Sequence, residues 1–488
     1  MKNKILFCFL MLSFTAFSQG FITPSEKNNF SKVTSYNELM EFIGQAVSLN
    51  PAIKADYSGR SVQGRVIPVL FVSHNPDNPV VYLFAQQHGN ETAGKEGMLF
   101  LIKELAEGKL DNYLQKISLL LIPSVNPDGN EVNRRRNGNG ADLNRDHIKM
   151  FQPEVQLIHE NYRKYKPVLC VDIHEYVGST EEWIKFGAYK TYNIQTGVLT
   201  NYDIPEKVKS FSKGKAIPFI KEKVTGAGYT FNEYTVGGPP NLARLRYSTT
   251  DINDGRTSTG LLGSLSFIIE GKREDGDSVA NLKVRALSQF TAAKAFIEFA
   301  AENIDEIIKL YKYSSEGLSI IDSVSIQQDH FNLTGKTSEF ILTSSATGKD
   351  TLIKTDALHE NVVPLKKVKT PAGYLIPASD PLLKEWCENY GVVTSPASDA
   401  MKKAVYEMRA EEYYTRNLEE YDMVFPEVKY QKMVLSNPDE YRYIDLSKNS
   451  KLRVVLALEP ESMYGLFIYE EFKYLMNKDG RYAILRVE

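Results

Sequence analysis

The sequence has few cysteines and almost no excess of charge of either sign. Three of the 488 residues are cysteine, and the formal net charge at pH 7 is −3. This charge balance offers no argument for binding to nucleic acid or to an anionic membrane surface. Beyond the first 20 residues the only cysteines are Cys170, which lies within an apolar run, and Cys387. We therefore expect Cys170 to be a buried free thiol and the stability to come from hydrophobic cores.

Long apolar runs are also missing beyond the first 20 residues, and the run at the start is short. Two lysines precede apolar residues 5–17, and small residues follow them. This order is typical of a secretory signal peptide, whereas a membrane span needs about 20 apolar residues. We expect residues 1–18 to be a signal peptide and the mature protein to be exported, periplasmic or extracellular, without a membrane span. The alternative is a membrane anchor.

Strand and helix patterns alternate between residues 78 and 176. Apolar runs typical of buried strands occur at 79–87, 117–129 and 166–176, and helical patterns occur at 92–107 and 153–165. Such alternation predicts an α/β fold, with a mixed, mostly parallel sheet that has helices on both faces. A further strand is expected from Gly263 and a long helix over about 278–313. Residues 177–262 are rich in loop residues, which is typical of a binding loop.

The pattern changes after about residue 314. Alternating strand patterns follow, then a strand and helix at 372–392 and again at 451–475. We therefore predict a catalytic domain over residues 19–315 and a smaller α+β accessory domain over 320–488. Because the candidate motifs all precede residue 320, the second domain is expected to supply no catalytic group.

Three side chains capable of binding a metal follow predicted strands. His88 and Glu91 lie in the turn between the strand at 79–87 and the helix at 92–107, and His174 closes the apolar run of the strand at 166–176. The carboxyl edge of such a sheet is where ligands bind. Two imidazoles and a carboxylate, with water in the fourth position, make a catalytic zinc site. For each histidine alone, a structural or surface role is the alternative.

A zinc hydrolase also needs a base, and Glu270 ends the strand that starts at Gly263. The alternative for Glu270 is a plain glutamate at a sheet edge. Residues 124–146 are loop residues that carry Arg134, Arg135, Arg136 and Arg145. An arginine cluster is either a solvated face or a carboxylate-recognition site, since guanidinium pairs with carboxylate through two bonds.

These motifs resemble, in order, those of the zinc carboxypeptidases similar to carboxypeptidase A. The resemblance covers about residues 60–310. The motifs are His-x-x-Glu at 88–91, Asn-Pro-Asp-Gly at 126–129, Arg-x-Asn at 135–137, Asp-Leu-Asn-Arg at 142–145, His174 and Glu270. The C-terminal region looks like an accessory domain of some secreted bacterial members.

The resemblance implies a role for each position. His88, Glu91 and His174 would hold one Zn²⁺ per chain, and Glu270 would act as general base. Arg135, or Arg136 because the run of three blurs the register, would stabilise the oxyanion. Asn144 and Arg145 would bind the free C-terminal carboxylate of a peptide or peptide-like substrate. Asp142 would orient His88, and Tyr247 is the candidate for the mobile tyrosine of the family.

The function implied is an exported zinc metallocarboxypeptidase. A zinc-dependent N-acyl-amino-acid deacylase of the same superfamily is the first alternative, because "HGNET" and "DLNR" also resemble that branch. A non-catalytic binding protein that keeps the fold is the second. The "NPDG" motif and the long spacing to Glu270 favour the peptidase.

Overall fold

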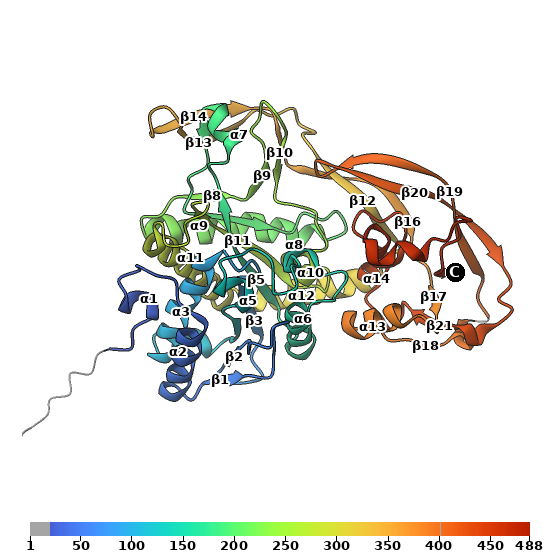
Figure 1. The fold of residues 1–488 in the computed structure, drawn as a ribbon, viewed down its shortest axis with the longest axis horizontal. Coiled ribbons are helices and arrows are strands. Elements are labelled where there is room, and N and C mark those ends of the chain that lie inside the picture. Colours follow the sequence, from blue (N-terminus) through green and yellow to red (C-terminus); the bar gives the residue numbers. More distant parts are fainter. Residues whose placement is uncertain (1–19, 401) are drawn as a thin grey trace, which may run out of the picture.

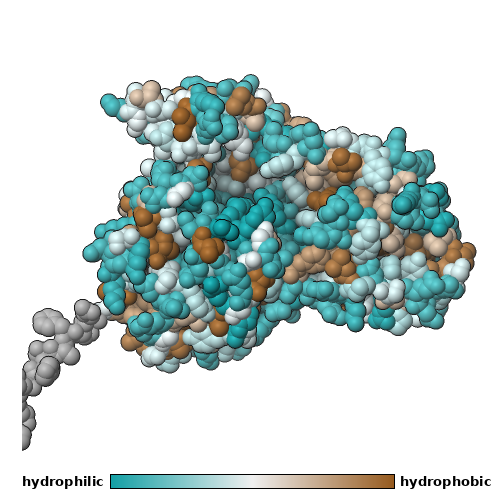
Figure 2. All heavy atoms as spheres, in the orientation of Figure 1, coloured by the Kyte–Doolittle hydropathy of each residue, from teal (hydrophilic) through white to brown (hydrophobic). Residues whose placement is uncertain are grey.

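The computed structural model describes residues 20–400 and 402–488 (Figure 1). The predicted signal peptide lies outside these residues. Among the helices of the described ranges, none combines the length and the apolar composition that crossing a membrane requires. On the face shown in Figure 2, hydrophilic residues cover most of the surface and the hydrophobic ones are scattered.

An eight-stranded sheet organises the first part of the chain. In spatial order its strands are β1 (Ile53–Asp56), β2 (Val69–Val72), β4 (Ser118–Ile122), β3 (Val80–Ala85), β5 (Leu169–Val177), β11 (Leu265–Arg273), β7 (Ile194–Val198) and β8 (Phe231–Glu233). Four neighbouring pairs are parallel, namely β4–β3, β3–β5, β5–β11 and β7–β8, and the other three are antiparallel. The mixed, mostly parallel sheet confirms the predicted fold class.

Helices cover both faces of this sheet. Gly94 of α3 (Thr92–Ala106) lies against Ile173 of β5, whereas Gly255 of α10 (Gly255–Gly260) lies against Asp172. Neighbouring residues of a strand point to opposite faces, so α3 and α10 lie on opposite sides of the sheet. Further helices of this part are α2 (Tyr36–Leu49), α6 (Pro153–Tyr165), α9 (Ile217–Gly226), α11 (Leu282–Glu302) and α12 (Ile304–Ser319). The short ones are α1 (Pro24–Lys27), α4 (Asp111–Leu114), α5 (Pro127–Glu131), α7 (Glu181–Phe186) and α8 (Glu206–Phe211).

The C-terminal region is rich in strands and lies to one side of the first part (Figure 1). Its six-stranded sheet has the order β18 (Ser395–Pro396), β21 (Tyr441–Asp445), β17 (Gly373–Pro377), β22 (Leu485–Val487), β19 (Val405–Leu418) and β20 (Tyr421–Met433). Two helices accompany it, α13 (Pro381–Tyr390) and α14 (Lys451–Leu458). The strands β12 (Ser323–Phe331) and β16 (Asn361–Lys369) form a separate antiparallel pair.

Segments from beyond residue 320 pair with loops of the first part. The hairpin of β13 (Ser338–Ser344) and β14 (Asp350–Thr355) adds to β6 (Ala188–Tyr189). Likewise β15 (Leu358–His359) pairs with β10 (Leu245–Tyr247), which also pairs with β9 (Thr235–Gly237). The largest hydrophobic cluster runs from Leu39 to Ile484, and two smaller clusters lie in the C-terminal sheet and around Trp183. The domain boundary between residues 315 and 320 stays a prediction, and it does not coincide with a break in the core.

Three local predictions differ from the structure. Residues 177–262 contain helices α7 to α10 and five short strands, so they are less irregular than expected. The long helix expected over 278–313 is two helices, α11 and α12, that meet at Asn303. Residues 451–458 form α14 instead of a strand, because a short continuous apolar run has no periodicity that separates a buried strand from a buried helix.

Candidate metal centre and catalytic site

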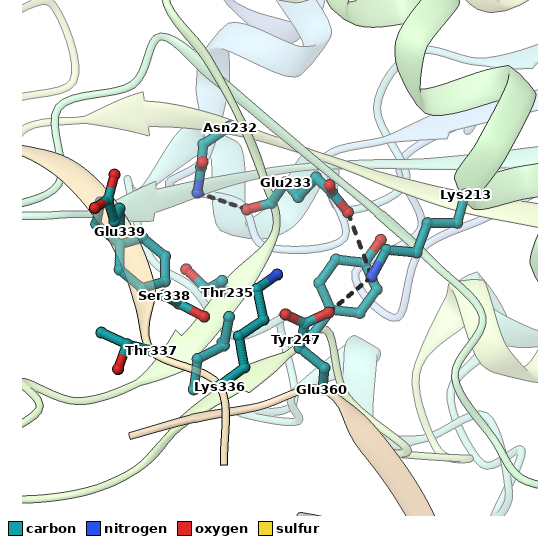
Figure 3. Close-up of a pocket in the computed structure, with 12 residues that line it drawn as sticks. Lys213, Asn232, Glu233, Thr235, Tyr247, Lys336, Thr337, Ser338, Glu339 and Glu360 are labelled. Atoms are coloured by element: carbon teal, nitrogen blue, oxygen red, sulfur yellow. Dashed lines mark hydrogen bonds and ion pairs between the residues drawn. The ribbon is translucent and has the colours of Figure 1, made fainter. Parts of the chain in front are cut away.

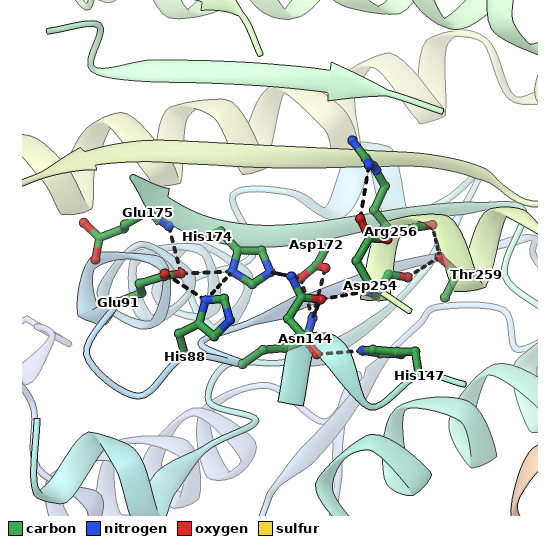
Figure 4. Close-up of polar contacts among 12 residues, drawn as sticks. His88, Glu91, Asn144, His147, Asp172, His174, Glu175, Asp254, Arg256 and Thr259 are labelled. Atoms are coloured by element: carbon green, nitrogen blue, oxygen red, sulfur yellow. Dashed lines mark hydrogen bonds and ion pairs between the residues drawn. The ribbon is translucent and has the colours of Figure 1, made fainter. Parts of the chain in front are cut away.

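Three predicted metal ligands meet at the carboxyl edge of the sheet (Figure 4). His88 follows β3, and Glu91 immediately precedes α3. His174 lies inside β5, which continues to Val177, so it is near the end of the strand and does not close it. Because β3 and β5 are parallel neighbours, their carboxyl ends bring these side chains together.

The distances within this group are short. His88 Nδ1 lies 2.8 Å from Glu91 Oε1, and His174 Nδ1 lies 2.9 Å from Glu91 Oε2. The two Nδ1 atoms are 3.2 Å apart, and all three side chains are buried. Ligands about 2.0–2.1 Å from a tetrahedral zinc lie roughly 3.3 Å from one another, so this spacing is close to that of a zinc site.

In both histidines the Nε2 atom contacts an aspartate, while the Nδ1 atom faces the other candidate ligands. His88 Nε2 lies 3.1 Å from Asp142 Oδ1, and His174 Nε2 lies 2.9 Å from Asp172 Oδ1. An ionised carboxylate only accepts hydrogen bonds, so each Nε2 carries a proton, and a metal ion that replaces the proton on each Nδ1 would find a lone pair there. Two lone pairs and a carboxylate then face one point, and a metal cation there satisfies all three.

The carboxylate behind His88 is held in its ionised form. Burial opposes ionisation of Asp142, but the hydrogen bond with His88 and the charge of Arg135 outweigh it and lower the pKa of this carboxyl. Both oxygens of Asp172 accept hydrogen bonds from Gln87 Nε2, at 3.0 and 2.9 Å. Each candidate ligand histidine therefore has a fixed orientation and a fixed tautomer.

Glu270 lies beside the candidate metal centre. β11 runs parallel to β5, and Glu270 is the register partner of His174. The Glu270 side chain is buried, and β11 continues three residues beyond it to Arg273. Burial raises the pKa of Glu270 to about 8, while the charge of His174 and a hydrogen bond from Tyr234 act in the opposite direction.

Of the arginine run, Arg135 is the member that reaches the centre. Its Nη1 lies 3.2 Å from His88 Nδ1 and 3.6 Å from Glu91 Oε1, while its Nη2 pairs with Asp142 Oδ2 at 2.9 Å. Arg136 instead donates to the carbonyl oxygen of Gly140 at 3.0 Å. Of the two candidates for the oxyanion donor, Arg135 is therefore the one near the candidate ligands, and its role stays a prediction.

Asn144 and Arg145 differ in how available they are to a substrate. Asn144 is buried, and its Oδ1 accepts from Gln87 Nε2 at 3.1 Å and from the backbone amide of Gly255 at 2.8 Å. The Arg145 side chain is 46% exposed, and its Nη2 lies 3.8 Å from Asp251 Oδ2. Of the two, Arg145 is therefore the residue whose charged group is accessible to a substrate.

The tyrosine next to Glu270 is Tyr234, and Tyr247 lies elsewhere. The Tyr247 ring is 4.1 Å from Lys213 Nζ. It lines a cavity of about 470 Å³ that also contains Glu233 and Glu360 (Figure 3). Tyr234 is the residue between β8 and β9, and its hydroxyl acts to lower the pKa of Glu270. The spacing argument for Tyr247 therefore selected a residue outside the candidate site.

Sequence reasoning also missed Asp172, although a signal was present. Asp172 and His174 are two residues apart on one strand, so their side chains share a face. Asp251 and Tyr464 were missed for a different reason, because they are 213 residues apart in the chain. Their hydroxyl–carboxylate contact is 2.7 Å long.

A second cluster of metal-capable side chains comprises Asp329, His330 and Glu419. Arg244 Nη2 lies 2.7 Å from Asp329 Oδ2, and Arg246 pairs with Glu419. Two guanidinium groups thus neutralise the two carboxylates, and a cation there would add uncompensated charge. We interpret this cluster as an ion-pair network that joins the β19–β20 turn to β10.

Comparison with known proteins points to one family. Residues 39–169 match the family model described as zinc carboxypeptidase, a segment that contains His88 and Glu91 and ends before His174. The chain is 26% identical to Carboxypeptidase 2 of Trichophyton tonsurans over 459 residues, which is 89% of this chain and 82% of that relative. It is 32% identical to Carboxypeptidase D of Drosophila melanogaster over 186 residues, covering 32% of this chain and 13% of that one.

Among solved structures, carboxypeptidase A of Helicoverpa armigera superposes with a TM-score of 0.45 and 17% sequence identity. That superposition covers 57% of this chain and 75% of the other.

Proposed function

Because the chain belongs to the zinc carboxypeptidase family, we propose that it is an exported zinc metallocarboxypeptidase that hydrolyses the C-terminal bond of peptides. The observation that carries this proposal is the convergence of His88, Glu91 and His174 beside Glu270. The proposed chemistry follows from what each of these groups can do at that position.

The three ligands would hold one zinc ion, which supplies a Lewis acid for the scissile carbonyl and makes water more acidic. Asp142 and Asp172 keep the ligand histidines oriented, with their protons on Nε2. Glu270 accepts a proton from the attacking water and later donates one to the leaving amine. A nearby divalent cation favours the ionised form of Glu270, which a base requires.

The role proposed for Arg135 is to stabilise negative charge as it develops on the carbonyl oxygen. Its guanidinium is within 4 Å of two of the candidate ligands, and Asp142 fixes its orientation through a paired contact. A preorganised donor at that point acts on the transition state more than on the substrate. The Arg145 guanidinium then receives the free C-terminal carboxylate, and Asn144 braces the backbone around it.

Export remains part of the proposal and is supported by the first 18 residues of the sequence alone. The expected site of action is the periplasm or the extracellular space. Recovery of the protein from those fractions would test the localisation, and identification of its N-terminal residue would test the cleavage after Ser18. The zinc content of the same protein would test the metal.

The substrate proposal is tested with one peptide in two forms, a free acid and a C-terminal amide. The free acid should be cut, and the amide should be nearly inert, because it leaves Arg145 unpaired. Arg145→Ala should raise KM for the acid and reduce the preference over the amide. Equal cleavage of the two forms by the wild-type protein would contradict a carboxylate-reading site.

Substrate length separates the peptidase from the deacylase alternative. A carboxypeptidase tolerates several residues upstream of the scissile bond, whereas a deacylase pocket accepts one small acyl group. Turnover of N-acyl amino acids without any turnover of tri- or tetrapeptides would favour the deacylase. Zinc binding without hydrolysis of any amide would favour the non-catalytic alternative.

A further inference from the structure

Two cavities adjoin each other at Lys213, and Figure 3 shows the larger one. The first, of about 470 Å³, lies between the strands β8 to β10 and a segment from beyond residue 320. The second, of about 400 Å³, lies between the α8 region and the start of β16. Lys213, Tyr247 and Glu360 line both cavities and therefore separate them. No residue assigned to the metal, to the base or to substrate binding lines either cavity.

The ammonium group of Lys213 shows which chemistry fits between the side chains around it. Its Nζ atom lies 3.1 Å from Glu360 Oε2 and 4.0 Å from Glu233 Oε2. The same atom lies 4.1 Å from the centre of the Tyr247 ring. Two carboxylates and an aromatic face are partners that a primary ammonium group prefers. We call Glu233, Tyr247 and Glu360 the ammonium cage.

Lys213 leaves part of this cage without a partner. Among the described residues, no hydrogen-bond partner exists for Glu233 Oε2, the Tyr247 hydroxyl or Thr235 Oγ1. Tyr247 and Thr235 are 4% and 5% exposed, and both line the first cavity. Burial and the charge of Glu233 raise the pKa of the Tyr247 hydroxyl, which stays protonated. Buried polar atoms normally have a partner, so these three atoms indicate a polar ligand in the first cavity.

Lys213 is held weakly and can leave the cage. Its side chain is 41% exposed, so the ion pair with Glu360 contributes little. Lys213 belongs to a π-helical turn, Ser212–Ala216, between α8 and α9. Such turns are rare in proteins and occur frequently at functional sites. Withdrawal of Lys213 would leave the two carboxylates of the cage facing a continuous groove.

The remaining charges of the first cavity limit the rest of the ligand. Glu339 already has a partner, since its Oε1 lies 2.7 Å from Lys354 Nζ. Lys336 also lines the cavity, and it forms no ion pair with a carboxylate in the part of the chain that the structure describes. A second cation on the ligand would be repelled by Lys336. The ligand therefore carries a single ammonium group, and its other end is neutral or anionic.

We propose that the ammonium cage is a second ligand site, which binds the primary ammonium group of a small molecule or peptide when Lys213 withdraws. Lys213 is then a tethered occupant that competes with the ligand. The proposal does not rest on the proposed function, because no residue of the candidate catalytic site takes part. The ammonium group belongs either to a peptide N-terminus or to a lysine side chain, and the first test distinguishes these sources.

The first test is a ligand-observed NMR titration of the zinc-loaded protein with two amines. Alaninamide represents a peptide N-terminus, and butylamine represents a lysine side chain. Neither has a carboxylate, so neither is attracted to Arg145. Saturable binding is expected, and the amine that binds more tightly identifies the source. N-acetylalaninamide, which is neutral, should not bind. Absence of saturable binding by both amines, or equal binding of the acetylated compound, would overturn the proposal.

The second test uses two substitutions with opposite expected effects. Lys213→Met removes the tethered ammonium group and keeps the length of the side chain, so the amine should bind about two- to fivefold more tightly, the range for a partly exposed ion pair. Glu360→Gln removes one carboxylate of the cage and should weaken binding by a similar factor. An unchanged or lower affinity in Lys213→Met would show that Lys213 does not compete and would refute its role.

A matched control separates competition from a general change in charge. Lys215 lies on the same π-helical turn, and its Nζ pairs with Glu306 at 2.7 Å outside both cavities. Lys215→Met should therefore leave the affinity for the amine unchanged. An equal gain in Lys213→Met and Lys215→Met would reject the cage. Equal affinities of Glu360→Gln and the wild-type protein would place the amine elsewhere, for example at the metal, and would also reject it.

Discussion

Replacing Asp172 with asparagine would test how much of the metal affinity depends on the residues behind the ligands. Asp172 is fully buried, and its Oδ1 lies 2.9 Å from His174 Nε2. Both of its oxygens also accept from the amide nitrogen of Gln87. Asparagine has nearly the same shape but has one acceptor and one donor where aspartate has two acceptors, so it cannot satisfy both neighbours.

The magnitude follows from these contacts. A hydrogen bond to a charged group is worth about 1.5–3 kcal/mol and a neutral one about 0.5–1.5 kcal/mol, so loss of the charge alone costs roughly 1–1.5 kcal/mol. If the amide keeps its contact with His174, its nitrogen faces the Gln87 nitrogen, which costs a further ~1 kcal/mol. Zinc affinity should therefore fall by about 10- to 100-fold, the usual effect of removing such a partner.

The measurement is a competition titration of zinc against a chromophoric chelator at fixed pH. Asp203→Asn is the control, since this half-buried aspartate accepts from Ser325 and contacts no candidate ligand. The control should bind zinc like the wild-type protein. An Asp172→Asn protein that is folded and binds zinc within threefold of wild type would refute the claim that Asp172 supports His174.

Three further outcomes are expected. Glu270→Gln should keep zinc and peptide binding and lose turnover by about 10²–10⁴, measured by steady-state kinetics, and a variant within a few-fold of wild type would place the base elsewhere. His174→Ala should no longer bind one zinc per chain, and unaltered stoichiometry by atomic absorption would remove it from the ligand set. Burial raises the pKa of Asp146 to about 7 from 3.8 in the unfolded chain, so its contribution is fully favourable below pH 4 and is lost as the pH rises through 7. Asp146→Asn, which resembles the protonated acid, should therefore gain about 2–3 kcal/mol in stability relative to wild type between pH 5 and pH 8, and a constant difference in urea unfolding would contradict this.

The parts of the site that follow strand ends could be read from the sequence. His88 and His174 were identified because an apolar strand precedes each one and parallel neighbours bring their carboxyl ends together. Glu270 followed from the same rule. In each case an apolar strand pattern shows where the strand ends, and the parallel topology places that end at the same edge of the sheet. Both features can be recognised from the sequence.

The parts of the site that depend on tertiary packing could not be read in this way. Tyr234 reaches Glu270 from a turn between two short strands, and no periodic pattern marks its direction. Tyr464 meets Asp251 because a C-terminal segment packs across the first part of the chain. The same kind of packing explains why the helix at residues 451–458 could not be predicted, since burial on all sides leaves no periodic pattern of apolar residues.

The hydrophobic cluster that continues through both parts of the chain has a consequence for how the protein responds to metal. A ligand that binds only the native state stabilises every part of the chain that unfolds together with its site. Zinc held beside α3 would then slow proteolysis of the distant β19–β20 hairpin, and its removal would expose that hairpin to cleavage. At a free zinc concentration 100 times the dissociation constant, this protection is about 2.7 kcal/mol over the whole chain.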